Sequence, residues 1–362
     1  MAKQSPLAQW QRANGAAFVE HEGWLLADHF GDPKNEYQCV RTACGLFDLS
    51  QRALLQFTGP DRVSFLQGML SNDLRRLSMF EGQQATLLTQ QGKVLADVRV
   101  LCAMNSIYLD FWEPLKDKIY SHLNRYLVAD EVEINQPSDS WTILSLQGTR
   151  APELLDTLFN RAELPKLPDH HRMVQFNGAP ICIVRADHGG GKGFDLIVGK
   201  AQVLATAEEL ARLGASWIGV RAQNILRVEA GIPRYGVDFT EQNLLLEVGL
   251  DNAVSFTKGC YLGQEVVERI RSRGHVNRKL CGLLLDGDEP ANAGDKILAQ
   301  ERSVGEITSS VVSLALNRPI AMGYIHKDHC APDTCLEVRH ESSVYSATVV
   351  SMPFVAPSPA HS

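Results

Sequence analysis

Hydrophobic and polar positions follow both helical and strand periods in the first 278 residues of the chain. A strand-like run at 54–59 reads LLQFTG, and Pro60 and Asp61 then end the strand and precede a helical pattern. In this pattern, RVSFLQGML, the apolar residues Val63, Leu66 and Met69 share one face. The stretch therefore predicts a strand followed by an amphipathic helix.

The same reading along the chain predicts a mixture of β-hairpins and helices. Two hairpins are predicted, ATLLTQQGKVLADVRVLCAM at 85–104 and PICIVRADHGGGKGFDLIVG at 180–199. Single strands are predicted at 106–112 and 141–148, and helices at 113–127, 151–159, 202–214 and 220–232. We therefore expect an α+β fold over residues 1–278.

The pattern of apolar and polar residues changes after residue 278. Short alternating runs separated by Gly, Pro and Asp follow one another, among them LCGLLLDG, SVGEITSSV and YSATVVSMPF. This pattern is typical of a small all-β barrel or sandwich, which we place at 279–355. The last residues, 356–362, read APSPAHS and predict a disordered tail.

Composition and charge narrow the function classes. The 362 residues carry a formal net charge of −7, with 44% apolar and 21% charged residues, as in an ordinary globular protein. We therefore do not expect nucleic acid as a direct ligand, although RIRSRGHVNRK at 269–279 is strongly basic. No apolar run is long enough to cross a bilayer, and the first residues do not resemble a signal peptide, so we expect a cytoplasmic protein without a membrane partner.

The eight cysteines are too sparse for a disulfide framework. One cluster, HKDHCAPDTC, places His326, His329, Cys330 and Cys335 close together in sequence. Its spacing matches no common zinc site, and Pro332 favours a turn between strands. We expect a surface loop here and no metal.

A further cysteine, Cys260, lies in the segment KGCYLGQE, residues 258–265. Cys260 follows Lys258, and a helix is expected to begin near Gly263. A nearby cation and a helix N-terminus favour the thiolate, which is the reactive form of cysteine. A free cysteine is also often only a small buried apolar residue, so both interpretations stay open here.

Several segments resemble the glycine-cleavage T-protein (aminomethyltransferase) superfamily. They occur in the family's order and cover nearly the whole chain: GLFDLS at 45–50, GPDRVSFLQGMLSNDL at 59–74, SLQGTRAPELL at 145–155, RVEAGIPRYGVD at 227–238, GEITSS at 305–310 and IAMGYI at 320–325. The resemblance implies three domains in a ring around a central folate pocket: two intertwined α+β domains over residues 1–278, and the barrel as the third domain. It also implies tetrahydrofolate, or a one-carbon derivative of it, as the small-molecule ligand.

The segment around Cys260 points to one branch of this superfamily. T-proteins carry an acidic residue at this position, in a KGDFIGRE-type segment, whereas KGCYLGQE is similar to the signature of YgfZ-type folate-binding proteins. That resemblance implies support of iron–sulfur cluster assembly or repair, and thereby of tRNA-modifying iron–sulfur enzymes. Iron–sulfur client proteins would then be partners, and Cys260 the working thiol.

Other differences from the T-protein pattern favour the same branch. In HGGGKGFD, Gly191 stands where the resemblance places a pterin-binding glutamate, and Gln223 stands where it places an arginine. In GKVLADV, Asp97 is the one acid left of a pair. The alternative is a folate-dependent aminomethyltransferase or methyltransferase with Asp97 as its acid or base, so whether the chain is an enzyme stays open.

The candidate site residues fall into two groups. Cys260 and Asp97 are the candidate catalytic residues, and the candidate folate-binding residues are Asp97, Gln223, Arg227, Lys258, Gly259 and Gln264. We interpret Glu229, which lies in the same predicted helix as Arg227, as a member of a structural ion pair.

Overall fold

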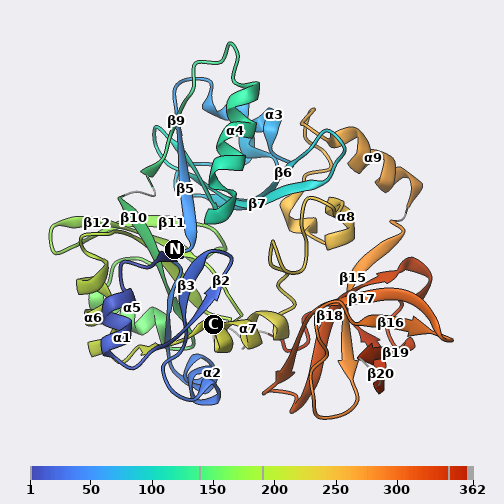
Figure 1. Cartoon of the computed structure of the whole chain (residues 1–362). Helices are drawn as coiled ribbons and strands as arrows, with labels where there is room; N and C mark the ends of the chain where they lie inside the picture. The colour runs from blue at the N-terminus through green and yellow to red at the C-terminus, as the bar shows by residue number, and fades with distance from the viewer. Residues whose placement is uncertain (1, 138–139, 190, 275, 341–342, 357–362) are drawn as a thin grey trace.

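Three folded units surround the centre of the molecule (Figure 1). The structure is a computed structural model that describes residues 2–356, except 138–139, 190, 275 and 341–342. The predicted disordered tail therefore lies outside the described residues, apart from Ala356. The combination of two α+β units with a closed β-barrel confirms the expected fold class.

The first unit is a five-stranded sheet with the strand order β6-β7-β8-β5-β9. Helices α3 and α4 contribute apolar residues to the hydrophobic core on one face of this sheet. The predicted hairpin and the helix before it are confirmed. The elements are β5 (Arg52–Thr58), α3 (Arg62–Met69), η1 (Leu74–Arg76), β6 (Gly82–Leu88), β7 (Val94–Cys102), β8 (Ile107–Trp112), η2 (Glu113–Leu115), α4 (Lys116–Tyr126) and β9 (Glu133–Asn135).

The second unit is a six-stranded sheet with the order β11-β12-β13-β10-β4-β14. A small sheet, β1-β3-β2, and helix α1 from the N-terminus lie beside it (Figure 1). The elements of both are β1 (Lys3–Gln4), α1 (Ala8–Ala13), β2 (Ala17–His21), β3 (Trp24–His29), α2 (Pro33–Thr42), β4 (Gly45–Asp48), β10 (Trp141–Gln147), α5 (Ala151–Leu158), β11 (His171–Phe176), β12 (Ala179–Arg185), β13 (Gly193–Gly199), α6 (Val203–Arg212), β14 (Ser216–Trp217) and α7 (Val220–Glu229).

The third unit is a closed barrel with the order β15-β18-β17-β16-β19-β20. A segment with two helices and one short turn connects it to α7. The elements are α8 (Leu245–Val248), η4 (Asp251–Ala253), α9 (Gln264–Arg273), β15 (Arg278–Leu285), β16 (Lys296–Ala299), β17 (Arg302–Ser313), β18 (Arg318–His326), η5 (Lys327–His329), β19 (Cys335–His340) and β20 (Ser343–Val350).

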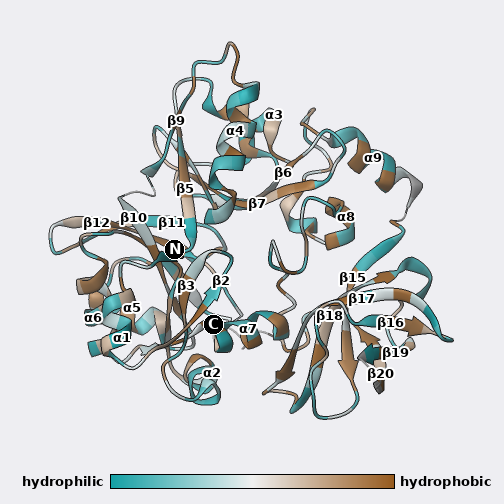
Figure 2. Ribbon diagram, in the orientation of Figure 1, coloured by the Kyte–Doolittle hydropathy of each residue, from teal (hydrophilic) through white to brown (hydrophobic). Residues whose placement is uncertain are grey.

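The burial of each strand follows from the alternation of its side chains. In β7, Val98 and Val100 are fully buried in the core, while Asp97 and Arg99 point to the opposite face. Figure 2 shows β7 as mainly hydrophobic and α9 as mixed, in agreement with a strand in the core and a helix at the surface. No helix among the described residues is long and apolar enough to span a membrane.

Candidate functional site

A cavity of about 560 Å³ lies where residues of the first two units meet α7 and the segment that follows it. This volume is within the range of small-molecule sites. Apolar and aromatic side chains line it together with charged ones. Its principal lining residues are Phe47, Leu49, Gln51, Arg52, Gln84, Asp97, Arg99, Trp112, Asp169, Arg185, Asp187, His188, Gln223, Asn224, Arg227, Arg234, Tyr235 and Leu250.

One wall of the cavity is the polar face of the first sheet. Strand register places Arg99 of β7 opposite Asp110 of β8, and Arg52 of β5 opposite Trp112 of β8. Asp97 lies two residues before Arg99 in β7 and therefore shares its face. The sheet thus buries apolar residues against α3 and α4 and turns a set of charges toward the cavity.

These charges form a buried network that joins the first two units. Asp110 is fully buried; its Oδ1 accepts a hydrogen bond from Arg52 Nε at 2.6 Å, and its Oδ2 accepts one from Arg99. The same Arg99 guanidinium lies 2.7 Å from Oδ2 of Asp195, on β13 of the second unit. Each buried charge therefore has a partner, as burial requires.

His188 extends this network into the loop between β12 and β13. Its Nε2 lies 2.9 Å from Oδ1 of the fully buried Asp195. Burial alone would raise the pKa of Asp195, but His188 and Arg99 together hold it far below its usual range. An ionised carboxylate only accepts, so Nε2 of His188 carries the proton that it donates to Asp195. The pair fixes the orientation of a histidine that lines the cavity.

Asp97 is half-buried in the cavity wall. Loss of hydration raises the pKa of its carboxyl above the usual range; the charge of Arg52 opposes this rise, and that of Asp110 adds to it. A carboxyl group whose pKa is raised keeps its proton to a higher pH, which suits an acid or base in a reaction.

Helix α7 brings two further predicted residues to the cavity. Gln223 lines it and donates from Nε2 to the carbonyl of Ile218 at 2.9 Å. Arg227 also lines it, but four of its five N–H donors are engaged within the protein. Its acceptors are Asn224 Oδ1 at 2.8 Å, Ile232 O at 3.1 Å, Asp238 Oδ2 at 2.7 Å and Ser309 Oγ at 2.8 Å. Since Ser309 belongs to β17, Arg227 also joins α7 to the barrel.

Glu229 has the structural role that its sequence context predicts. It is fully buried and accepts hydrogen bonds from Tyr37 at 2.7 Å, from Arg41 at 2.5 Å and from Ser313 at 2.6 Å. The ion pair with Arg41 joins α7 to α2 within the second unit, and the hydrogen bond from Ser313 joins the same carboxylate to the end of β17 in the barrel.

Lys258, a predicted folate-binding residue, lies outside the cavity. Its buried Nζ donates to the backbone carbonyls of Gln67 and Leu70 at 2.7 Å and of Asn72 at 2.9 Å, at the end of α3. Burial lowers the pKa of Lys258 to about 8, with a smaller opposing effect of Asp73. With all three donors used in this way, the ammonium holds the loop against α3 and is not available to a ligand.

The rest of the KGCYLGQE segment also lies outside the cavity. Gly259 and Cys260 are exposed and do not line it. The Oε1 atom of Gln264 accepts the N–H of Tyr261 at 3.2 Å, and α9 begins at Gln264 after Gly263, whose φ is +84°. A Cβ at Gly263 would lie 2.6 Å from the carbonyl oxygen of Thr89, so close packing explains this glycine. The structure thus separates Cys260 from Asp97, Gln223 and Arg227.

The HKDHCAPDTC segment forms the short helix η5 and the turn before β19. Within the described parts of the chain, no group of three or more His, Cys, Asp or Glu side chains is placed to hold a metal ion.

In the basic stretch at 269–279, His275 lies outside the described residues, and Arg271 stacks on Phe256 with 4.5 Å between the guanidinium carbon and the ring centroid.

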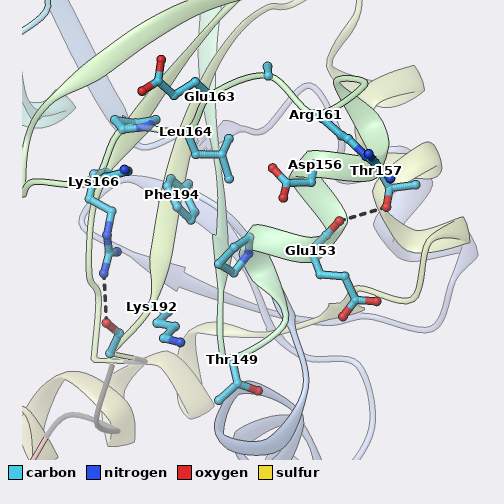
Figure 3. A pocket seen from close by; sticks show the side chains of 15 residues that line it. Thr149, Glu153, Asp156, Thr157, Arg161, Glu163, Leu164, Lys166, Lys192 and Phe194 are labelled. Atoms are coloured by element: carbon cyan, nitrogen blue, oxygen red, sulfur yellow. Dashed lines mark hydrogen bonds between the residues drawn. The ribbon is translucent and has the colours of Figure 1, made fainter. Parts of the chain in front are cut away.

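A second, wider concavity of about 950 Å³ lies on the outer face beside α5 (Figure 3). Gly191, the position at which the resemblance places a pterin-binding glutamate, lines this concavity and not the central cavity. Its carbonyl accepts a hydrogen bond from Arg185 at 3.1 Å, and Arg185 lines both hollows. The charges that line the concavity are exposed, and Glu153 among them is already paired with Arg150, which makes the concavity a weaker candidate than the central cavity.

The residues of the buried network were not among the residues predicted from the sequence. Arg99, Asp110 and Asp195 each interrupt an otherwise apolar strand, in DVRVLC, YLDFW and GFDLIV. A charge at such a position must be paired or functional, and that signal could have identified all three. Which charges pair with one another could not be read from the sequence, because the partners come from different units.

Comparisons with known proteins agree across nearly the whole chain. The family described as GCVT N-terminal domain matches residues 7–258, and the glycine cleavage T-protein C-terminal barrel domain matches residues 278–356. An aminomethyltransferase of Rubrobacter xylanophilus is 29% identical over 97% of this chain and 94% of its own length. An aminomethyltransferase of Nostoc sp. is 29% identical over 97% and 95%. The crystal structure of glycine cleavage system aminomethyltransferase T from Bartonella henselae superposes with a TM-score of 0.92 over 99% of both chains at 24% identity, which is a likeness of fold.

Proposed function

Since the chain belongs to the GCVT family, we propose that it binds tetrahydrofolate or a one-carbon derivative in the central cavity and transfers a one-carbon group there. The relatives named aminomethyltransferase support a transferase of that type. The observation that carries the proposal is the position of Asp97, a carboxyl with a raised pKa in the wall of a cavity of suitable size.

The lining of the cavity suits a folate. Trp112 and Tyr235 offer aromatic faces for a flat heterocycle. Of the five arginines in the lining, Arg52, Arg99 and Arg227 are paired with buried aspartates. The other two, Arg185 and Arg234, form no ion pair with a carboxylate of the described residues and suit the carboxylates of a folate tail. Arg234 is one of these arginines, and its buried Nε makes no hydrogen bond to the described residues. Bound tetrahydrofolate would supply the nitrogen atoms that accept a one-carbon unit.

In this proposal, the protein's own residues position the ligand and move a proton. Asp97 holds or releases a proton beside the transferred group, and the Arg52–Asp110–Arg99 network keeps the sheet face rigid. The exposed Cys260 takes no part in this transfer.

The direct test combines calorimetric titration with tetrahydrofolate and a transfer assay on an aminomethylated carrier protein. We expect wild type to bind tetrahydrofolate and to turn over, and Asp97→Asn to bind but to lose activity. Wild-type protein that binds no folate would refute the proposal, and wild-type protein that binds folate without any turnover would refute its transferase part.

The second candidate is a YgfZ-like role in iron–sulfur cluster assembly or repair, and one observation favours it. Cys260 is exposed on a surface loop, where it could meet a client protein without involving the folate cavity. Folate binding without turnover, together with loss of client-enzyme activity in a Cys260→Ala strain, would favour this candidate. Full complementation by Cys260→Ala would remove it.

A further inference from the structure

Two thiols of the barrel lie together, although they are far apart in sequence. Cys281 of β15 belongs to the hydrophobic core of the barrel, and Cys330, just after η5, packs against that core. Strand register sets Lys279 of β15 directly opposite Ile325 of β18. The Sγ atom of Cys281 lies 3.6 Å from the carbonyl oxygen of Lys279, and that of Cys330 lies 3.1 Å from the carbonyl oxygen of Ile325. Both sulfurs therefore lie beside the same directly paired residues, Lys279 and Ile325, at the barrel core.

We propose that Cys281 and Cys330 form a reactive dithiol that peroxides oxidise to a disulfide, with Cys330 as the attacking sulfur. This site is independent of the proposed folate chemistry. The sequence placed Cys330 in a cluster with Cys335, but the structure does not pair these two cysteines. Cys335 is exposed on β19, with its Sγ 4.0 Å from the carbonyl oxygen of Asp333.

The surroundings assign different roles to the two sulfurs. Hydrogen bonding by Cys281 lowers the pKa of Cys330 to about 7, although burial favours a higher value. The backbone N–H and the charge of Lys279 also lower this pKa, and the charge of Asp328 raises it. The hydrogen bond to Cys330, followed by burial, raises the pKa of Cys281, which therefore keeps its proton. A pKa of about 7 gives roughly 15-fold more thiolate at pH 7 than the usual value of about 8.5. In contrast, burial raises the pKa of Cys44 and Cys182 to about 12.

The reaction balances with hydrogen peroxide as the oxidant. The Cys330 thiolate attacks one peroxide oxygen and displaces hydroxide, which takes up a proton to become water, and Cys330 becomes a sulfenic acid. Cys281 then attacks the sulfur of Cys330 and a second water leaves. Two thiols and one peroxide thus give one disulfide and two waters, and the two electrons pass from the sulfurs to the peroxide.

The test treats the full-length protein with hydrogen peroxide at pH 7 and maps the thiols by mass spectrometry without reduction. Wild type and the matched control Cys335→Ser should each yield a linked pair of peptides that contain Cys281 and Cys330. Cys330→Ser should yield none. Cys281→Ala should instead accumulate a dimedone adduct at Cys330, because the resolving thiol is missing.

A second measurement on wild type tests the proposal even if a variant fails to fold. The rate of iodoacetamide labelling at Cys330 in wild type, followed against pH, should have its midpoint near 7, and Cys281→Ala should move the midpoint upward. A midpoint above 8 in wild type, or peroxide-treated wild type in which both thiols remain free, would overturn the proposal.

Discussion

The carboxylate of Glu229 is the point at which the second unit, α7 and the barrel are joined, and Glu229→Gln tests that junction. The side chain is fully buried and accepts from Tyr37 and Arg41 on α2 and from Ser313 on β17. Glutamine has nearly the same shape but turns one acceptor into a donor and leaves Arg41 without its counter-charge. Removal of one member of a buried ion pair costs about 3–5 kcal/mol, and we expect a loss of this size.

Urea unfolding at pH 7 measures this loss, and the exposed pair of Arg150 and Glu153 gives a matched control. Glu153→Gln should leave the unfolding midpoint nearly unchanged, because solvent screens that pair. An independent readout is Tyr37, whose pKa is raised to about 12, first by burial and then by its hydrogen bond to Glu229. Its ultraviolet titration should move to a lower pH in Glu229→Gln. A loss below about 1 kcal/mol, or an unchanged Tyr37 titration, would show that the junction does not depend on the charge.

Three further changes test the cavity and the loop beside α3. Asp97→Asn should lower the transfer rate by about 10²–10⁴-fold and leave tetrahydrofolate affinity within a few-fold, as measured by turnover and calorimetry; an unchanged rate would remove Asp97 as acid or base. The pKa of Asp195 is lowered by His188 and Arg99, so its stabilising effect is present above about pH 4 and is lost as the pH falls further; Asp195→Asn should flatten this part of the stability–pH curve in urea unfolding between about pH 2 and 5. The pKa of Lys258 is lowered to about 8, so the unfolded chain binds more protons between pH 8 and about 10.4, and wild-type stability should rise with pH there. Lys258→Met should lack that rise, and equal slopes in the two proteins would contradict the buried position of the ammonium.

The elements of the fold could be predicted from local sequence because their signals are local. Alternating apolar residues and the turn residues around Gly92 predict the β6–β7 hairpin, and Asp61 before an apolar helical face predicts α3. The short alternating runs after residue 278 predict the barrel in the same way. The pairing of β4 with β10 and β14 was not predicted, because these strands are nearly 100 residues or more apart and carry no mark of their partners.

The site could be predicted only in part, for a physical reason. Asp97, Gln223 and Arg227 were named from the sequence and do line the cavity, whereas Lys258, Gly259, Cys260 and Gln264 do not. The adjacency of Lys258 and Cys260 in sequence suggested an activated thiol, but the lysine side chain instead donates to carbonyls at the end of α3. The direction of a polar loop side chain depends on which unpaired backbone groups lie near it. For Lys258 these are carbonyl groups of a segment almost 200 residues earlier in the chain, which the local sequence does not reveal.

Helix α7 links the stability of the ring to the proposed ligand site. Gln223 and Arg227 are four residues apart, so they share the helix face that borders the cavity, while Glu229 lies on a different face, toward α2 and the barrel. A change that loosens the Glu229 junction therefore also frees the element that positions Gln223 and Arg227. Tetrahydrofolate affinity of folded Glu229→Gln should fall together with its stability, whereas Asp97→Asn should separate activity from both. Unchanged affinity in folded Glu229→Gln would mean that the cavity is held by the first two units alone, through Arg99 and its carboxylate partners.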